Sequence, residues 1–482
     1  MPKIAYHTLG CKLNFAETST YRRGLEAAGF ETVPWNGADA DFYLLNTCAV
    51  TTVAEKKSRG LIRAVHRRAP QAAIVVTGCY AALHQADIAA LDGVALVLNA
   101  AEKSQLVERV KLLRSRTEVF ADEADWKEVS ADEADGAEVS AGVATPGHGK
   151  GEGPDGDKLS RSDDAGNVGR GRSERSERSS ADTLAPERSD RRDAMLPAYS
   201  SGDRTRSFLK VQDGCDNFCA YCAVPYARGR SRNLPICEIV RQAEAIAAAG
   251  TLEIVLTGVN TGDFGRSTGE SFLDLLKALQ AVEGIARYRI SSIEPNLLTD
   301  EIIDWIASEG TKFLPHFHIP LQSGSNVVLK KVGRRYTTEL FASRIDRIRE
   351  KMGPKVFFGI DVIAGLPGET DEEFERSYAF LKDRIHPAFL HVFPFSPRPG
   401  TRAFTMDGQV QERVRTERAA RLEALCQDLH AEFIASCKGD RATVLWEGAV
   451  KGGMMEGYTE NYIRVERPYD AARVGTLEEI VL

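Results

Sequence analysis

The sequence predicts an α/β protein with an N-terminal parallel α/β sheet domain, a central partial (β/α)6 barrel and a small C-terminal β-barrel. Three observations lead to this fold class. Short apolar runs alternate with amphipathic segments before residue 118, the same alternation returns on a larger scale after residue 200, and short β-type runs with Gly-rich connections follow Gly439. We therefore divide the chain into four parts: 1–117, 118–200, 201–435 and 436–482.

The N-terminal part has the strand and helix order of a parallel sheet. Apolar runs predict strands at 3–9, 41–47 and 72–78, and amphipathic patterns predict helices at 16–29 and 52–68. Strands that alternate with helices in this way are typical of parallel α/β domains.

The central part repeats a strand and a helix six times. Its apolar runs lie at 207–212, 252–258, 286–293, 317–321, 356–367 and 388–395, separated by helical patterns such as 237–250. Six such units predict an open or partial barrel, whose chemistry is expected at the carboxyl ends of its strands. Short β-type runs at 442–450, 462–468 and 478–482 predict the small C-terminal β-barrel.

Residues 118–200 form a low-complexity insert that we expect to be disordered. Between Glu118 and Met195 there are 20 acidic and 11 basic residues, and ten of the 78 residues are Val, Leu, Met, Phe or Trp. So few apolar side chains cannot offset an ordering cost of roughly 1 to 2 kcal/mol per residue. The insert is either a solvated linker or a regulatory, RNA-contacting segment. It accounts for the acidic balance, since the net charge is −7 for the chain and +2 without this stretch.

We expect a cytoplasmic protein without a membrane anchor. The first residues lack the basic and long apolar stretches of a secretory signal, and no run of eighteen apolar residues occurs. In that compartment thiols stay reduced, so the nine cysteines are better explained as metal ligands or small buried side chains than as disulfides.

Three cysteines of the N-terminal part each follow a predicted strand and a turn-forming dipeptide. They are Cys11, Cys48 and Cys79, in "YHTLGC", "YLLNTC" and "VVTGC". Neighbouring parallel strands lie roughly 5 Å apart, so three strand ends can place the thiols within about 10 Å. Thiolates at such separations can hold an iron-sulfur cluster. The alternative is three unrelated buried cysteines.

A second set, Cys215, Cys219 and Cys222, has the spacing C-x-x-x-C-x-x-C in "GCDNFCAYC". A structural zinc site is closed by four ligands, and no second cysteine pair lies nearby; Cys237 is the one candidate for a fourth ligand. Three thiolates on a 4Fe-4S cluster leave one iron open for a substrate or cofactor. We therefore favour an open iron-sulfur site over zinc.

This second set resembles the signature of radical S-adenosylmethionine enzymes, with Tyr221 before the last cysteine. The three-cysteine domain and the small β-barrel look like the methylthiotransferase branch of that family. Within it, "HTLGCKLNFAETS", "NTCAVTTVAEKKSR" and "VTGCYA" are similar to the tRNA methylthiotransferases that act on N6-threonylcarbamoyladenosine beside the anticodon, position 37. The resemblance covers nearly everything except the insert.

The resemblance implies two 4Fe-4S clusters and S-adenosyl-L-methionine as cofactors. Cys215, Cys219 and Cys222 would hold the cluster that binds S-adenosylmethionine and releases a 5'-deoxyadenosyl radical. Cys11, Cys48 and Cys79 would hold an auxiliary cluster that carries the sulfur to be transferred. The radical would remove hydrogen from C2 of the adenine, a C–H bond that no acid or base residue can ionise, so the cofactors supply the difficult chemistry.

Further cofactor contacts are expected at strand ends that match the family's motifs. We expect Tyr221 to face the adenine of S-adenosylmethionine, although it could instead be a packed aromatic residue beside the cluster loop. The remaining candidates are Glu294, Gln322, Ser323 and Gly365, each of which could equally be a turn former.

The tRNA anticodon stem-loop is the expected macromolecular partner. The helix predicted at 52–68 carries Lys56, Lys57, Arg59, Arg63, Arg67 and Arg68. Together with basic clusters at 228–232 and 330–336, this helix could form a track for phosphates, or it could simply be solvated. The resemblance also implies an electron donor such as flavodoxin or ferredoxin, while the sulfur donor is not specified.

The C-terminal part, with Trp446, Tyr458 and Tyr462, resembles the TRAM domain, a small RNA-binding β-barrel; a stabilising cap is the alternative. Two other substrates fit the same chemistry, namely isopentenyladenosine in tRNA and an aspartate of a ribosomal protein. The sequence "LGCKLN" around Cys11 favours threonylcarbamoyladenosine. A reading from another class is a non-catalytic, RNA-binding iron-sulfur sensor, which would have no need for an open iron.

Overall fold

The computed structural model describes residues 1–49, 51–119 and 195–482, without the side chains of residues 116–119. The disordered insert predicted at 118–200 lies, between residues 120 and 194, outside the described residues. The N-terminal sheet, the barrel and the C-terminal sheet belong to one compact unit. Within the described residues, no helix has the length and apolar character needed to cross a membrane.

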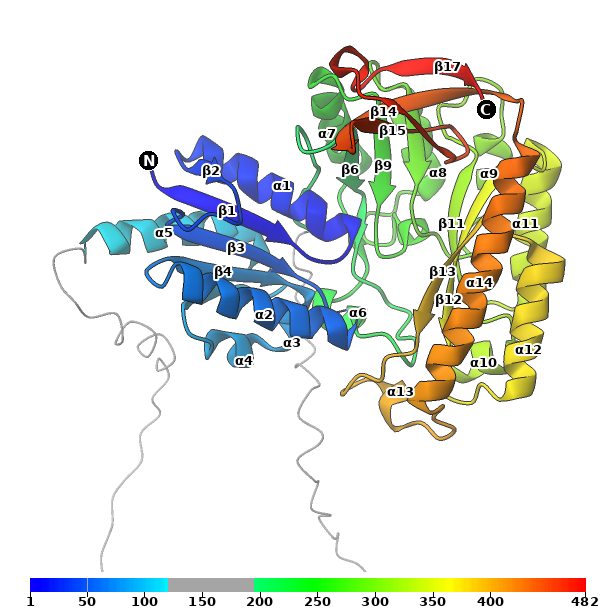
Figure 1. Ribbon diagram of the computed structural model, residues 1–482, viewed down its shortest axis with the longest axis horizontal. Helices are drawn as coiled ribbons and strands as arrows, with labels where there is room; N and C mark the ends of the chain where they lie inside the picture. Colours follow the sequence, from blue (N-terminus) through cyan, green and yellow to red (C-terminus); the bar gives the residue numbers. More distant parts are fainter. Residues whose placement is uncertain (50, 120–194) are drawn as a thin grey trace, which may run out of the picture. The chain divides into compact units, whose positions relative to one another are not determined.

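The N-terminal sheet has five parallel strands in the order β2-β1-β3-β4-β5 (Figure 1). In chain order the strands are β1 (Lys3–Thr8), β2 (Glu31–Val33), β3 (Phe42–Thr47), β4 (Ala73–Gly78) and β5 (Val94–Val97). The helices are α1 (Lys12–Ala27), α2 (Thr52–Arg68), α3 (Cys79–Leu83), α4 (Gln85–Ala89) and α5 (Leu106–Val119). All six residues of the central strand β3 are buried, as expected for a parallel strand that is covered on both faces.

The barrel is built from two three-stranded parallel sheets, β10-β9-β6 and β11-β12-β13. The strands are β6 (Arg206–Lys210), β9 (Glu253–Thr257), β10 (Arg287–Ile290), β11 (His316–Gln322), β12 (Phe357–Ala364) and β13 (Phe389–Pro394). The amide of Ile293, just after β10, donates to the carbonyl of His318 on β11 at 3.1 Å and links the two sheets. Six strands in chain order confirm the predicted (β/α)6 fold class.

Helices cover the outside of the barrel, because alternate strand residues such as Ile254, Leu256, Ile360 and Val362 belong to the apolar core. The helices of this part of the chain are α6 (Val224–Arg228), α7 (Ile236–Ala248), α8 (Phe272–Gln280), α9 (Asp300–Ile306), α10 (Asn326–Lys331), α11 (Thr338–Met352), α12 (Asp371–Ala379), α13 (Arg402–Thr405) and α14 (Glu412–Ser436). The other alternate residues, including His318, Asp361 and His391, are absent from this core and belong to the inner face of the barrel.

The C-terminal part is a curled antiparallel sheet in the order β16-β15-β14-β17. Its strands are β14 (Arg441–Lys451), β15 (Met454–Tyr458), β16 (Arg464–Pro468) and β17 (Leu477–Val481). Arg287 and Arg289 of β10 both bind the buried Glu253. They also donate to backbone carbonyls of the C-terminal part, including that of Thr459 at 2.7 Å. These contacts fix the small sheet against the amino ends of the barrel strands.

Candidate active site

The first three predicted ligands lie at one edge of the N-terminal sheet. Cys11 follows β1, Cys48 follows β3 and Cys79 follows β4. The register pairs Thr8 with Asn46 and Thr47 with Gly78, so the three strands end at nearly the same level. The fold therefore brings together three thiols that are far apart in the sequence, because parallel neighbours end at the same edge of a sheet.

Two glycines allow the cysteine loops to approach one another closely. A Cβ atom on Gly10, whose φ is +98°, would lie 2.8 Å from the Sγ of Cys48. A Cβ atom on Gly78, whose φ is +100°, would lie 2.3 Å from the carbonyl oxygen of Thr47. Both positions thus require glycine for the conformation and for the space. Burial raises the pKa of Cys79, and the nearby Cys11 adds to this effect while Arg228 opposes it.

The second set of ligands lies in the loop between the two-residue strand β7 (Gln212–Asp213) and α6. The amide of Cys215 donates to the carbonyl of Gly229 at 3.0 Å, which folds the loop back onto the end of α6. Gly214 has a φ of +73°, and a Cβ atom there would lie 2.0 Å from the carbonyl oxygen of Arg230. Burial raises the pKa of Cys215 and of Cys222 to about 12, so thiolates form here when a metal replaces the protons.

Arg334 connects the second cysteine set to two of the predicted cofactor contacts. Its guanidinium lies 3.3 Å from the Sγ of Cys219 and 3.4 Å from the hydroxyl of Tyr221, and it forms a 2.8 Å ion pair with Glu294. Glu294 also accepts from the side-chain amide of Asn217, within the cysteine loop, at 2.8 Å. Tyr221 and Glu294 therefore lie beside the second cysteine set.

The remaining predicted contacts lie at the carboxyl ends of β11 and β12. Gln322 ends β11 with a φ of +71°, and Ser323 follows it as a buried residue. Gly365 follows β12, and its amide donates to Glu369 at 2.8 Å. That all of these residues contact S-adenosylmethionine stays a prediction.

A buried network of charges, which sequence reasoning missed, lies between the two cysteine sets. Glu17 of α1 and Asp213 of β7 are the carboxylates, and the cations are Lys103, Lys210 and Arg228. Burial alone would raise the pKa of Asp213, but the surrounding cations outweigh it and hold that pKa well below its usual value. Glu17 lies in the helical pattern "AETST", where nothing marks it as buried.

Arg228 contacts the first cysteine set from α6, six residues after Cys222. Its Nε donates to the Sγ of Cys79 at 3.3 Å, and Nη1 contacts Asp213 at 2.8 Å. The side chain is buried, so its assignment to the phosphate-binding cluster 228–232 was wrong. Arg334, in the cluster 330–336, is likewise buried at its side chain and is directed to Cys219.

The basic helix predicted at 52–68 is α2, and its apolar face is buried through Ile62 and Val65. Two of its six cations make tertiary contacts, since Arg59 donates to the hydroxyl of Tyr80 and Arg68 donates to backbone carbonyls. The exposed cations are Lys56, Lys57, Arg63 and Arg67. In the C-terminal part, Trp446 is buried in the small core. The ring of Tyr462 lies beneath the Arg289 guanidinium, 4.8 Å from it.

Both cysteine sets have the donor chemistry of iron-sulfur sites. Each offers three thiols on short loops, with an arginine directed at one sulfur, and a positive charge near the sulfurs offsets the negative charge of ligated thiolates. Thiolates are soft donors that bind iron-sulfur clusters, whereas hard cations such as Mg²⁺ prefer oxygen donors. The residues present therefore fit two clusters.

Comparison with known proteins agrees with this geometry. Residues 209–381 match the radical SAM superfamily, and residues 3–99 match the uncharacterized protein family UPF0004. A solved radical S-adenosylmethionine methyltransferase, TsrM from Kitasatospora setae, has a similar fold with a TM-score of 0.51 at 15% identity, covering 95% of this chain and 77% of that one.

Curated relatives are similar over nearly the whole chain. The threonylcarbamoyladenosine tRNA methylthiotransferase MtaB of Bacillus subtilis is 36% identical over 471 residues, which covers 96% of this chain and 90% of the relative. Its counterpart in Thermotoga maritima is 32% identical and covers 100% of this chain and 94% of the relative. A tRNA-2-methylthio-N(6)-dimethylallyladenosine synthase of Alkaliphilus oremlandii is 36% identical over 59% of this chain and 60% of its own length. The chain therefore belongs to the threonylcarbamoyladenosine tRNA methylthiotransferase family of radical SAM enzymes.

Proposed function

We propose that this enzyme adds a methylthio group to C2 of N6-threonylcarbamoyladenosine at position 37 of tRNA, using two 4Fe-4S clusters and S-adenosyl-L-methionine. The observation that carries the proposal is the contact of Arg228 with Cys79. This arginine follows Cys222 by six residues, so one short helix connects the two cysteine sets. A reaction that needs a radical source and a sulfur carrier at one substrate atom requires such proximity.

In this proposal Cys215, Cys219 and Cys222 hold the cluster that binds S-adenosylmethionine, and Cys11, Cys48 and Cys79 hold the auxiliary cluster. Tyr221, Glu294, Gln322, Ser323 and Gly365 contact S-adenosylmethionine. When bound, these cofactors supply the radical that removes the C2 hydrogen and the sulfur that replaces it.

The protein's own residues position these groups and control the local charge. Arg334 forms an ion pair with Glu294 and contacts Cys219, so it fixes a carboxylate and a positive charge beside the second cysteine set. Arg228 does the same for Cys79, and the carboxylates of Glu17 and Asp213 hold its guanidinium in place. Through this buried network, the position of the first cysteine set depends on that of the second.

The exposed cations of α2, with Lys330 and Lys331 on α10, would contact phosphates of the anticodon stem-loop. Because tRNA is the substrate, we place the enzyme in the cytoplasm with an electron donor such as flavodoxin or ferredoxin. We further propose that the parts 1–117, 201–435 and 436–482 act as the methylthiotransferase, radical SAM and TRAM-like RNA-binding domains, joined by the insert 118–200.

Nucleoside mass spectrometry of tRNA tests the proposal. Cells that lack this protein should lose the methylthio group of threonylcarbamoyladenosine, and the wild-type chain should restore it. The variant Cys219→Ala should not restore it, whereas Cys237→Ala, at an exposed cysteine of α7, should. If cells that lack the protein keep the methylthio group on threonylcarbamoyladenosine, the proposed substrate is wrong. If they lose the methylthio group of dimethylallyladenosine instead, that base is the substrate.

A further inference from the structure

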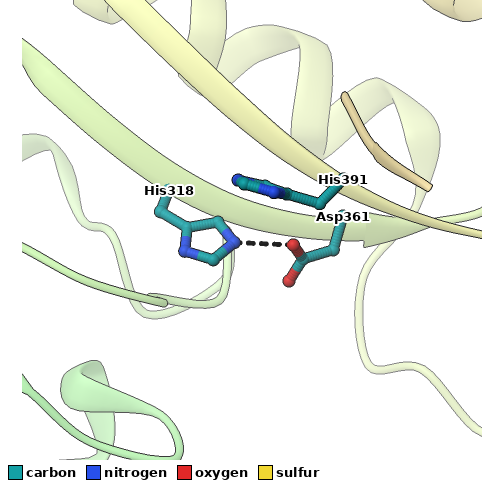
Figure 2. A group of neighbouring side chains, drawn as sticks. All are labelled: His318, Asp361 and His391. Carbon is teal, nitrogen blue, oxygen red and sulfur yellow. Dashed lines mark hydrogen bonds and ion pairs between the residues drawn. The ribbon is translucent and has the colours of Figure 1, made fainter. Parts of the chain in front are cut away.

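Three polar side chains meet on the inner face of the barrel, before the carboxyl ends of their strands. His318 of β11, Asp361 of β12 and His391 of β13 come from adjacent strands and point toward one another (Figure 2). One side-chain nitrogen or oxygen atom from each residue lies within 4.8 Å of those from the other two. The register pairs Asp361 with His391 directly, and the two histidine rings lie 4.8 Å apart between centroids. None of the three is among the predicted cofactor contacts.

The protonation of this cluster follows from its contacts. His318 Nε2 and Asp361 Oδ1 are 2.6 Å apart. Burial alone would raise the pKa of Asp361, but His318 and its hydrogen bond outweigh it and lower that pKa. Since Asp361 is then ionised, His318 Nε2 is the donor. Burial, with a contribution from His318, lowers the pKa of His391 to about 4, so its ring is neutral near pH 7 and offers one N–H donor.

Lys12 extends the cluster from the N-terminal sheet. It is the first residue of α1, directly after Cys11, and α1 packs on β6 through a contact of Phe15 with Phe208, 5.6 Å between ring centroids. Lys12 is partly buried, and none of its interactions within the described residues is an ion pair. Its charge acts on Asp361 and on His391. Burial lowers the pKa of Lys12, and Tyr462 and Asp361 oppose this effect. Lys12 therefore acts on the barrel cluster from a position directly after Cys11, without a carboxylate at ion-pair distance among the described residues.

The local charge distinguishes two possible ligands of this cluster. Two histidines and an aspartate could bind a divalent metal ion. However, Lys12 adds positive charge that acts on Asp361 and His391, and Asp361 is already engaged by His318. A cation would be repelled by the Lys12 ammonium, whereas a carboxylate would be attracted by it. Asp361 and His318 keep 17% and 22% of their side-chain surface exposed, so a ligand can reach them.

We propose that Lys12, His391 and the His318–Asp361 pair form a subsite for the threonylcarbamoyl group of the substrate base. Lys12 pairs with its carboxylate, the His391 N–H donates to the same group, and Asp361 accepts from its hydroxyl or urea N–H. The inference rests on the proposed function and deepens it, because it explains selection of this base. A dimethylallyl group would leave the Lys12 ammonium desolvated without a partner, which disfavours that base.

The test uses the reconstituted full-length enzyme and two anticodon stem-loop RNAs. One carries N6-threonylcarbamoyladenosine, and the other carries an analogue in which 2-hydroxypropylamine replaces threonine and the carboxylate is absent. We expect wild type to bind the first RNA about 10- to 100-fold more tightly, the range for a hydrogen bond to a charged group. Equal binding of the two RNAs by wild-type enzyme that methylthiolates the first would overturn the inference and leave the proposed function intact. Failure of wild type to methylthiolate the first RNA would overturn both.

Variants assign the effect to Lys12. Lys12→Met should bind both RNAs equally and keep the wild-type iron content. Lys12→Arg should recover part of the preference for the RNA that carries the carboxylate. The control Lys277→Met, at an exposed lysine of α8, should behave as wild type. Discrimination that persists in Lys12→Met would refute the assignment. Asp361→Asn should retain carboxylate discrimination. Zinc, or iron beyond the two clusters, that is present in wild type and lost in Asp361→Asn would show a metal site in place of the carboxylate subsite.

Discussion

Replacement of Asp213 by Asn should destabilise the protein strongly. The Asp213 carboxylate is fully buried and contacts Lys103 and Lys210 at 2.9 Å and Arg228 at 2.8 Å. In the variant these three cations share the single carboxylate of Glu17. Removing one partner of a buried ion pair costs about 3 to 5 kcal/mol, because the opposite charge stays buried without compensation. We therefore expect the free energy of unfolding to fall by about 3 to 5 kcal/mol.

Guanidinium denaturation of the apoprotein, followed by tryptophan fluorescence, measures this change. Asp428→Asn, at an exposed position of α14, is the control and should change the free energy of unfolding by less than about 0.5 kcal/mol. The double variant Asp213→Asn, Lys210→Met should recover part of the loss, because it removes one uncompensated cation. A loss below about 1 kcal/mol in Asp213→Asn would refute the view that these charges are buried and mutually dependent.

The same network sets an acid limit on stability. The folded-state pKa of Asp213 lies well below 3.8, the ordinary pKa of an aspartate, because the surrounding cations outweigh its burial. Its contribution to stability is therefore complete above pH 3.8 and is lost as the pH falls toward the folded-state pKa. The Asp213→Asn variant should lack this part of the acid dependence. If the variant loses stability at low pH as wild type does, this acid dependence arises from other carboxylates.

Three further outcomes are expected. Each of two variants, Cys215→Ala and Cys48→Ala, should lower the iron and sulfide content by one cluster. The control Cys426→Ala, at another buried cysteine, should leave both contents unchanged. Equal iron in all three proteins would exclude the proposed ligands. Gly214→Ala should reduce the iron content of the radical SAM site, because residue 214 has a positive φ and the new Cβ would lie 2.0 Å from a backbone oxygen. The control Gly60→Ala, whose Cβ would meet no atom within 4 Å, should leave the iron content unchanged. His391 should titrate near pH 4 in NMR spectra of the apoprotein. Because the same residue in the unfolded chain takes up its proton at about pH 6.5, the stability of the protein should fall as the pH drops from about 6.5 toward 4. A titration midpoint above pH 6 would contradict the burial of His391.

The sequence alone determined the order of the elements and the positions of the six cysteines. Apolar runs placed the strands of the barrel to within a few residues, since a buried parallel strand needs an uninterrupted apolar run. The strands β2, β5 and β15 were not predicted, because their short, partly exposed patterns resemble those of loops. The position of each cysteine after a strand was visible in the sequence, because a thiol at a strand end is a local feature.

Only the tertiary structure decided which charged residues belong to the site. Arg228 and Arg334 lie in basic runs that resemble a phosphate-binding surface, yet both are buried beside cysteine sulfurs. Lys12, His318, Asp361 and His391 are up to hundreds of residues apart, and the apolar runs that contain the last three do not indicate which side chains of other strands lie beside them. The physical reason is that the energy of a charge depends on the groups that the fold places around it, and the order of residues along the chain does not specify those groups.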